Sequence, residues 1–263
     1  DQEVTTFRGV STSRALPRAL EGKAPALSVG DLLAADMDAD ARTTFQSMYD
    51  TETNALLSGT SKELFDAMRR LKEADPSKYQ PAEGIRYPMG QGGGFGRSLR
   101  TVAQLIKADL GLEIAFVDVG GWDTHANQGG VDPQNGQLPG RLQGFSQALA
   151  AFYKDLGDRM DDVVVLTMSE FGRTARENGN VGTDHGKANV MFLMGGAVKG
   201  GKIYGDWPGL APEQLNESRD LAMTTDFRDV FAEVLVRHLG CADPNVVFPG
   251  FSVDATRFRG VLA

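Results

Sequence analysis

The chain has 263 residues, of which 41% are hydrophobic and 24% are charged, and these proportions are those of an ordinary folded protein. They exclude a disordered tail, a collagen-like fibre and a coiled coil. The formal net charge is −8 and no run of basic residues interrupts the chain, so we expect no nucleic-acid partner. No apolar stretch is long enough to cross a membrane, and we expect no membrane span.

The first 79 residues divide into two parts by their pattern. Residues 1–30 show neither a helical nor a strand period, and we expect an extended lead-in there. Residues 31–79 follow a helical pattern and are expected to form a helical insertion or side lobe. The chain begins at Asp1 with no methionine and no apolar leader. We therefore expect a processed protein or a fragment, with one α/β domain over residues 1–263.

Helices and strands alternate through the rest of the chain, with the core expected at residues 97–240. Short runs of apolar residues predict strands at 113–119, 162–168 and 189–194. Apolar residues at helical spacing predict helices at 97–110, 142–160 and 226–239. This order predicts an α/β fold with a mostly parallel sheet and helices on both of its faces.

Histidine and carboxylate residues gather in the turns beside these strands. Asp123 and His125 follow the first strand, Glu170 follows the second, and Asp184 and His185 precede the third. In open α/β sheets ligands bind beyond the carboxyl ends of the strands, and a mixture of imidazole and carboxylate ligands suits a divalent metal ion. The pattern predicts a metal site, while local backbone hydrogen bonds in glycine-rich turns are the alternative explanation.

Other polar residues give weaker signals. Arg173 is placed to bind an anionic substrate or, equally, to form a salt bridge with a carboxylate. Ser169 also follows a strand, but it lacks the flanking glycines of a hydrolase nucleophile elbow. Cys241 follows a helix C-terminus, where the dipole disfavours a thiolate, and His238 is interpreted as structural. The segment 225–228 is interpreted as the start of the last helix.

Two segments carry a family resemblance. The sequence GGWDTHANQ, followed after a helix by VVVLTMSEFGRTARENGNVGTDHGKANVMFLMGGAVKGGKIYGDWPGL, resembles the bacterial family known as domain of unknown function fifteen-oh-one. The resemblance extends from about Gly96 to Gly240. That family is placed in the alkaline phosphatase-like superfamily, which includes phosphatases, phosphodiesterases, sulfatases and phosphomutases, and its members are typically exported. The resemblance therefore implies an alkaline phosphatase-like fold and export to the periplasm or the cell exterior.

The resemblance also implies roles for individual residues. Superfamily enzymes bind one metal ion through an Asp and a His after a middle strand and a His before a late strand. The matching positions are Asp123, His125 and His185. Because the spacing of the first two differs from the usual spacing, and because Asp184 with His185 also looks like the superfamily's Asp-His pair, Asp184 is an alternative ligand. Zinc is the expected ion, with calcium, magnesium and manganese as alternatives.

The second metal and the nucleophile fit the superfamily pattern less well. The second metal usually takes an Asp-His pair, and the chain has Glu170 followed by Phe171, so a carboxylate is kept and the histidine is lost. The superfamily's nucleophile comes from an N-terminal segment with no match in this chain, so the nucleophile is not assigned. The resemblance therefore implies that this chain is the C-terminal part of a longer domain. Arg173 is the expected clamp for an anionic ester.

These residues together lead to three functional hypotheses. The leading one is an exported metal-dependent hydrolase that acts on a small phosphate or sulfate ester. The first alternative is a non-catalytic binding or structural protein that keeps the fold and one metal ion. A serine hydrolase that uses Ser169 is the third.

Overall fold

A computed structural model describes residues 7–22, 24–29, 69–70, 78–88, 93–129 and 136–263. The described chain divides into two units. Unit 1 comprises residues 1–120 and 144–156, and unit 2 comprises residues 121–143 and 157–263. The helical lobe expected at 31–79 lies almost wholly outside the described residues.

Unit 1 contains a small parallel sheet. Its strands β1 (Gly9–Ser11), β2 (Ala26–Ser28) and β3 (Ile114–Phe116) have the order β2-β1-β3, and both pairings are parallel. The central strand β1 is wholly buried. Two of the three strands therefore lie in residues 1–30, where no strand period was expected. Strands of three residues are too short for an alternation of apolar and polar residues to appear.

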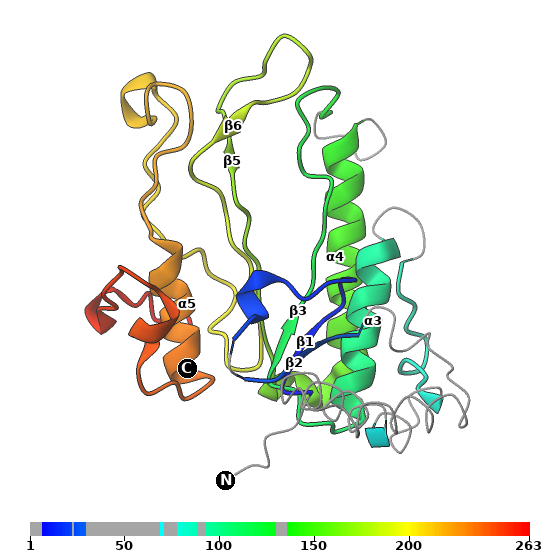
Figure 1. The fold of residues 1–263 in the computed structure, drawn as a ribbon. Coiled ribbons are helices and arrows are strands. Elements are labelled where there is room, and N and C mark those ends of the chain that lie inside the picture. The colour runs from blue at the N-terminus through cyan, green and yellow to red at the C-terminus, as the bar shows by residue number, and fades with distance from the viewer. Residues whose placement is uncertain (1–6, 23, 30–68, 71–77, 89–92, 130–135) are drawn as a thin grey trace, which may run out of the picture. The chain divides into compact units, whose positions relative to one another are not determined.

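The core of unit 1 forms between this sheet and helix α3 (Gly93–Lys107). Phe7, Val10, Leu105 and their buried neighbours make one apolar cluster. The predicted apolar face of the helix is confirmed, because Leu99, Val102 and Leu105 are all buried. Figure 1 shows α3 beside α4 (Gln137–Leu156), whose C-terminal part belongs to unit 1.

Two contacts hold α3 and α4 together within unit 1. The rings of Phe95 and Phe145 are stacked with their centroids 5.2 Å apart. Lys107 at the end of α3 forms an ion pair of 2.6 Å with the buried Asp155 of α4. Gly157, with a φ of 54°, ends α4, and a 3-10 helix (Gly157–Asp162) follows. The helix expected at 142–160 is therefore an α-helix and a 3-10 helix in succession.

Unit 2 contains two antiparallel strand pairs. Strand β4 (Val164–Leu166) pairs with β7 (Leu193–Gly195), and β5 (Gly172–Arg173) pairs with β6 (His185–Gly186). A mostly parallel sheet was expected, but in the described residues only the three strands of unit 1 are parallel. Parallel neighbours need a crossover connection, usually a helix, and the chain between β4 and β7 contains the β5–β6 hairpin and no helix. β4 and β7 are only partly buried, whereas their unbroken apolar runs in the sequence are typical of buried strands.

Helix α5 (Phe227–Arg237) begins where the sequence predicts. Asp226 is its N-cap, and its side chain accepts a hydrogen bond of 2.9 Å from the Arg228 backbone N–H. The buried Glu233 of the same helix accepts from the backbone N–H of Gly260, which ties the C-terminal segment to α5. In the described part of the chain no helix has both the length and the apolarity needed to cross a membrane.

Candidate metal centre

Asp123 and two histidines meet in unit 2. His185 Nε2 lies 2.7 Å and His125 Nε2 lies 2.9 Å from the same carboxylate oxygen, Asp123 Oδ1. The two imidazole rings are 4.8 Å apart between centroids and are inclined by 34°. The side chains of Asp123 and His185, which are 62 positions apart in the chain, are therefore in direct contact.

This group has the composition of a metal site. One ligand atom each from Asp123, His125 and His185 lies within 4.8 Å of the others, so the three residues could hold a metal ion. Their side chains are 59%, 45% and 47% exposed, so an ion can reach them from solvent. The hydrogen bond from His185, followed by the nearby His125, holds the pKa of Asp123 below its ordinary value. Asp123 is therefore ionised at neutral pH, as a metal ligand must be.

Asp184 contacts the opposite nitrogen of His125. Its Oδ1 lies 3.0 Å from His125 Nδ1, while His125 Nε2 faces Asp123. Asn178 Nδ2 donates 3.0 Å hydrogen bonds to Asp184 Oδ1 and to the His125 backbone carbonyl. The hydrogen bond from Asn178, and next that from His125, lowers the pKa of Asp184. A carboxylate on the second nitrogen of a ligating histidine fixes the tautomer and the ring orientation.

The loop that carries His125 is joined to the turn before His185. The backbone N–H of Gln128 donates a 2.8 Å hydrogen bond to the Val181 carbonyl. A Cβ on Gly182 would lie only 2.3 Å from the backbone carbonyl carbon of His125, so a glycine is required for this approach. Val181 itself has a φ of 58°, which is strained for a β-branched residue.

Phe171 covers one face of His185. The two rings are stacked, with centroids 4.1 Å apart and an interplanar angle of 13°. This contact limits the rotation of the imidazole ring and keeps its Nε2 directed toward Asp123. The aromatic side chain therefore supports His185 from the position directly after Glu170.

Arg173 joins the two loops of the centre. Its Nη1 donates a 2.5 Å hydrogen bond to the Thr183 carbonyl, and its Nη2 donates to the Trp122 carbonyl. A longer contact of 3.4 Å reaches Asp123 Oδ1. A guanidinium group has five N–H donors, so the three contacts leave two for another partner. The salt bridge to a carboxylate, which the sequence offered as one role of Arg173, is thus present only as a long contact with Asp123. The shorter hydrogen bonds of Arg173 are to backbone carbonyls.

The remaining sequence candidates lie outside this group. Glu170 is exposed and does not belong to the cluster of Asp123, His125 and His185. The Ser169 hydroxyl donates to the Phe171 backbone carbonyl at 3.0 Å, and not to a histidine.

Two residues of the centre were not anticipated from the sequence. Asn178 holds Asp184 and the His125 loop, and its position in the turn-forming segment Glu-Asn-Gly-Asn was the one available signal. Asp220 is wholly buried and accepts a 2.8 Å hydrogen bond from the backbone N–H of Lys187, two residues after His185. No sequence pattern marks this contact of Asp220, because Lys187 is 33 positions away.

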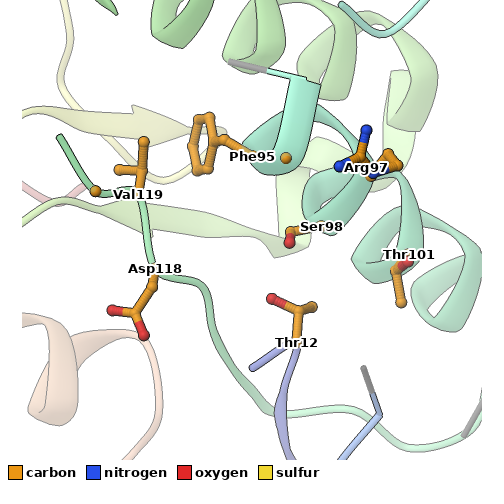
Figure 2. Close-up of a pocket in the computed structure, with 9 residues that line it drawn as sticks. Thr12, Phe95, Arg97, Ser98, Thr101, Asp118 and Val119 are labelled. Carbon is orange, nitrogen blue, oxygen red and sulfur yellow. The ribbon is translucent and has the colours of Figure 1, made fainter. Parts of the chain in front are cut away.

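A separate cavity lies in unit 1, at the carboxyl ends of β1 and β3. Figure 2 shows Thr12, Ser98, Thr101 and Asp118 around this cavity, which has a volume of about 610 Å³. Ligands of α/β proteins often bind at this edge of a sheet. Its lining residues include a single carboxylate, Asp118, and no histidine. This cavity therefore lacks the imidazole ligands that the sequence predicts for a metal site, and those residues lie in unit 2.

A comparison with models of protein families identifies the family of this chain. A family model described as protein of unknown function (DUF1501) matches residues 13–249. The chain belongs to this DUF1501 family. The match extends over most of both units and includes Asp123, His125 and His185 of the candidate metal centre. Searches of curated proteins and of solved structures found no match.

Proposed function

We propose that this DUF1501 protein is an exported, metal-dependent hydrolase of phosphate or sulfate esters, of the alkaline phosphatase-like type. The observation that supports the proposal best is the meeting of Asp123, His125 and His185 within 4.8 Å. Phosphate and sulfate esters carry negative charge on oxygen, which divalent ions and arginine both bind. The resemblance of the sequence motifs to the superfamily supplies the reaction class.

The residues present fit a divalent transition metal. Two imidazole nitrogens and one carboxylate oxygen form a common ligand set for zinc, and three protein ligands leave a position open for a substrate or water. Calcium and magnesium prefer oxygen ligands, which makes them weaker candidates for a set with two histidines. Zinc is therefore the expected ion, and manganese is the first alternative.

A bound ion would polarise the ester oxygen and stabilise the negative charge that develops in the transition state. Asp123, His125 and His185 would hold it, and Asp184 would orient His125. The two free N–H donors of Arg173 would bind the anionic group of the ester, and Glu170 remains a candidate for a second ion. We expect the nucleophile to come from a segment outside this chain.

Two observations favour a non-catalytic binding or structural protein as the second candidate. Phe171 packs against His185 at the position where a second metal ion would need a histidine. Arg173 already uses three contacts on the protein itself. A relative that has lost turnover would keep the first metal site and the fold.

A panel of aryl phosphate, phosphodiester and sulfate ester substrates separates the two candidates when it is tested on the full-length protein, with the segment expected to carry the nucleophile. A hydrolase gives turnover that depends on added zinc or manganese and that His185→Ala abolishes. His238→Ala is the matched control, because His238 caps the end of α5 and does not belong to the cluster. The absence of metal-dependent turnover from the folded, metal-loaded full-length protein would favour the binding protein.

A further inference from the structure

Asp220 is a fully buried carboxylate in unit 2, and it contacts the strand that carries His185. Its side chain is 0% exposed. An ionised carboxylate is expensive to bury unless hydrogen bonds satisfy its oxygens. A wholly buried aspartate is therefore expected to have hydrogen-bond donors around its carboxylate oxygens.

The partners of Asp220 come from two segments. One is the backbone N–H of Lys187, which donates to Oδ2 at 2.8 Å. The other is a local pair, with Asn216 Nδ2 at 3.3 Å and Arg219 Nε at 3.1 Å from Oδ1. Burial raises the pKa of Asp220, but the hydrogen bonds from Lys187, Asn216 and Arg219 outweigh it, and the pKa is lowered overall. The carboxylate therefore stays ionised at neutral pH.

The contact with β6 is close as well as polar. A Cβ on Gly186 would lie 2.6 Å from the Cβ of Asp220, so the two residues are in direct contact. Asp220 also forms an isolated bridge with Thr174, which directly follows β5. Asp220 therefore touches both sides of the β5–β6 hairpin, in which Arg173 is paired with His185.

These contacts lie next to the candidate metal ligand. The Lys187 N–H that Asp220 binds is two residues from His185, and Gly186 is its immediate neighbour. The backbone on the C-terminal side of His185 is thus fixed by Asp220, while Phe171 fixes the ring itself. A metal ligand held in advance binds its ion more tightly, because less freedom is lost on binding.

We infer that Asp220 is a positioning residue for the metal centre, acting through the backbone of β6 on His185. This inference rests on the proposed metal site and concerns how that site is held in shape. The groups that face the carboxylate are the Lys187 N–H, the Asn216 amide and the Arg219 guanidinium. None of them is a candidate metal ligand, so Asp220 acts on the metal centre through the backbone of the β5–β6 hairpin and not by direct contact with a ligand.

The test is a titration with cobalt(II), whose visible spectrum reports ligation, followed by competition with zinc. Asp220→Ala should weaken the metal Kd by about 10-fold to 100-fold, as is usual for residues that orient a ligand. Asp220→Asn retains one oxygen that can accept from the Lys187 N–H, so it should recover part of the affinity. Asp229→Ala is the matched control, because Asp229 is also buried in unit 2 and pairs with Arg257.

The control distinguishes positioning from a general loss of stability. If Asp229→Ala lowers the melting temperature and leaves the metal Kd unchanged, while Asp220→Ala weakens the Kd, the inference holds. An unchanged Kd in folded Asp220→Ala, or equal weakening in Asp229→Ala, would overturn it.

A second readout is independent of metal binding. In NMR spectra of the metal-free protein, Asp220→Ala should shift the resonances of the His185 ring and of the Lys187 amide more than those of the His125 ring. If the wild-type protein binds no metal, the proposed function fails, and this comparison still tests the positioning role. Unshifted His185 signals in the variant would overturn the positioning role itself.

Discussion

The buried carboxylate of Asp155 offers the most quantitative test of the fold of unit 1. Its Oδ1 accepts from Lys107 Nζ at 2.6 Å and from the Ala82 backbone N–H at 2.8 Å. Its Oδ2 accepts from the hydroxyls of Tyr79 and Tyr87. One side chain therefore ties the segment around Tyr79 to both α3 and α4, and alanine would break all four bonds.

The expected loss of stability follows from burial. Removing one partner of a buried ion pair costs about 3–5 kcal/mol, because the other charge is left uncompensated. The Lys107 side chain is 26% exposed and can turn to water, which reduces the cost. The tyrosine hydroxyls would add to it, since an unsatisfied buried donor costs about 1–3 kcal/mol. We therefore expect Asp155→Ala to lower the free energy of unfolding by about 3–4 kcal/mol.

Urea unfolding followed by near-UV circular dichroism of tyrosine measures this change. Tryptophan fluorescence follows the other unit separately, because Trp122 and Trp207 both lie in unit 2. Glu83→Ala is the control, since Glu83 is an exposed acid in the same segment as Tyr79, and it should change stability by less than about 0.5 kcal/mol. A loss below about 1 kcal/mol in Asp155→Ala would refute the buried network.

The same carboxylate predicts an acid dependence. Burial raises the pKa of Asp155, but hydrogen bonds from Lys107, Tyr79 and the Ala82 amide outweigh it, so the pKa in the folded state is lowered. A carboxyl group whose pKa is lower in the folded than in the unfolded state stabilises the folded protein. This stabilisation is complete above the pKa of the unfolded state, about 3.9, and is lost as the pH falls through the pKa of the folded state. Wild-type protein should therefore lose more stability than Asp155→Ala on acidification below about pH 4, and equal losses would contradict the ionised state.

Three further predictions concern single residues. Burial, and next the hydrogen bond to Asp155, raises the pKa values of Tyr79 and Tyr87. An alkaline absorbance titration should therefore leave these two tyrosines un-ionised until the protein unfolds. Ionisation at the ordinary tyrosine pKa of about 10 would contradict their burial. Val181→Asn should stabilise the protein by up to about 1 kcal/mol in thermal unfolding, because asparagine adopts a positive φ more easily than valine. Destabilisation would indicate that the Val181 side chain makes a stabilising contact. Asp226→Ala should cost about 1 kcal/mol in urea unfolding through the lost N-cap of α5, and no change would show that the cap is replaced.

Helices were the part of the fold that the sequence predicted well. The apolar residues of α3 recur at helical spacing, so Leu99, Val102 and Leu105 could be assigned to the core. Strands β1 and β2 have three residues each and leave no period to detect. The antiparallel pairing of β4 with β7 depends on the absence of a helix between them, and their apolar composition carries no information about strand direction.

The residues of the candidate metal centre were predictable where they lie close together in the sequence. Asp123 with His125, and Asp184 with His185, stand as pairs in turns beside predicted strands, and the structure brings Asp123 and the two histidines together. Asp220 acts through a backbone N–H far away in sequence, and a contact of that kind has no signature in composition or spacing. The role of Arg173 also needed the structure, because its bonds are to backbone carbonyls.

Metal content tests the central claim most directly. The protein is purified without chelator or affinity metal, supplemented with zinc, desalted and measured by inductively coupled plasma mass spectrometry. The proposed centre predicts zinc close to one ion per chain in the wild-type protein and in His238→Ala, and its loss in His185→Ala. A folded wild-type protein that retains no metal, or a His185→Ala variant that retains as much as the wild type, would contradict the assignment of Asp123, His125 and His185 as a metal site.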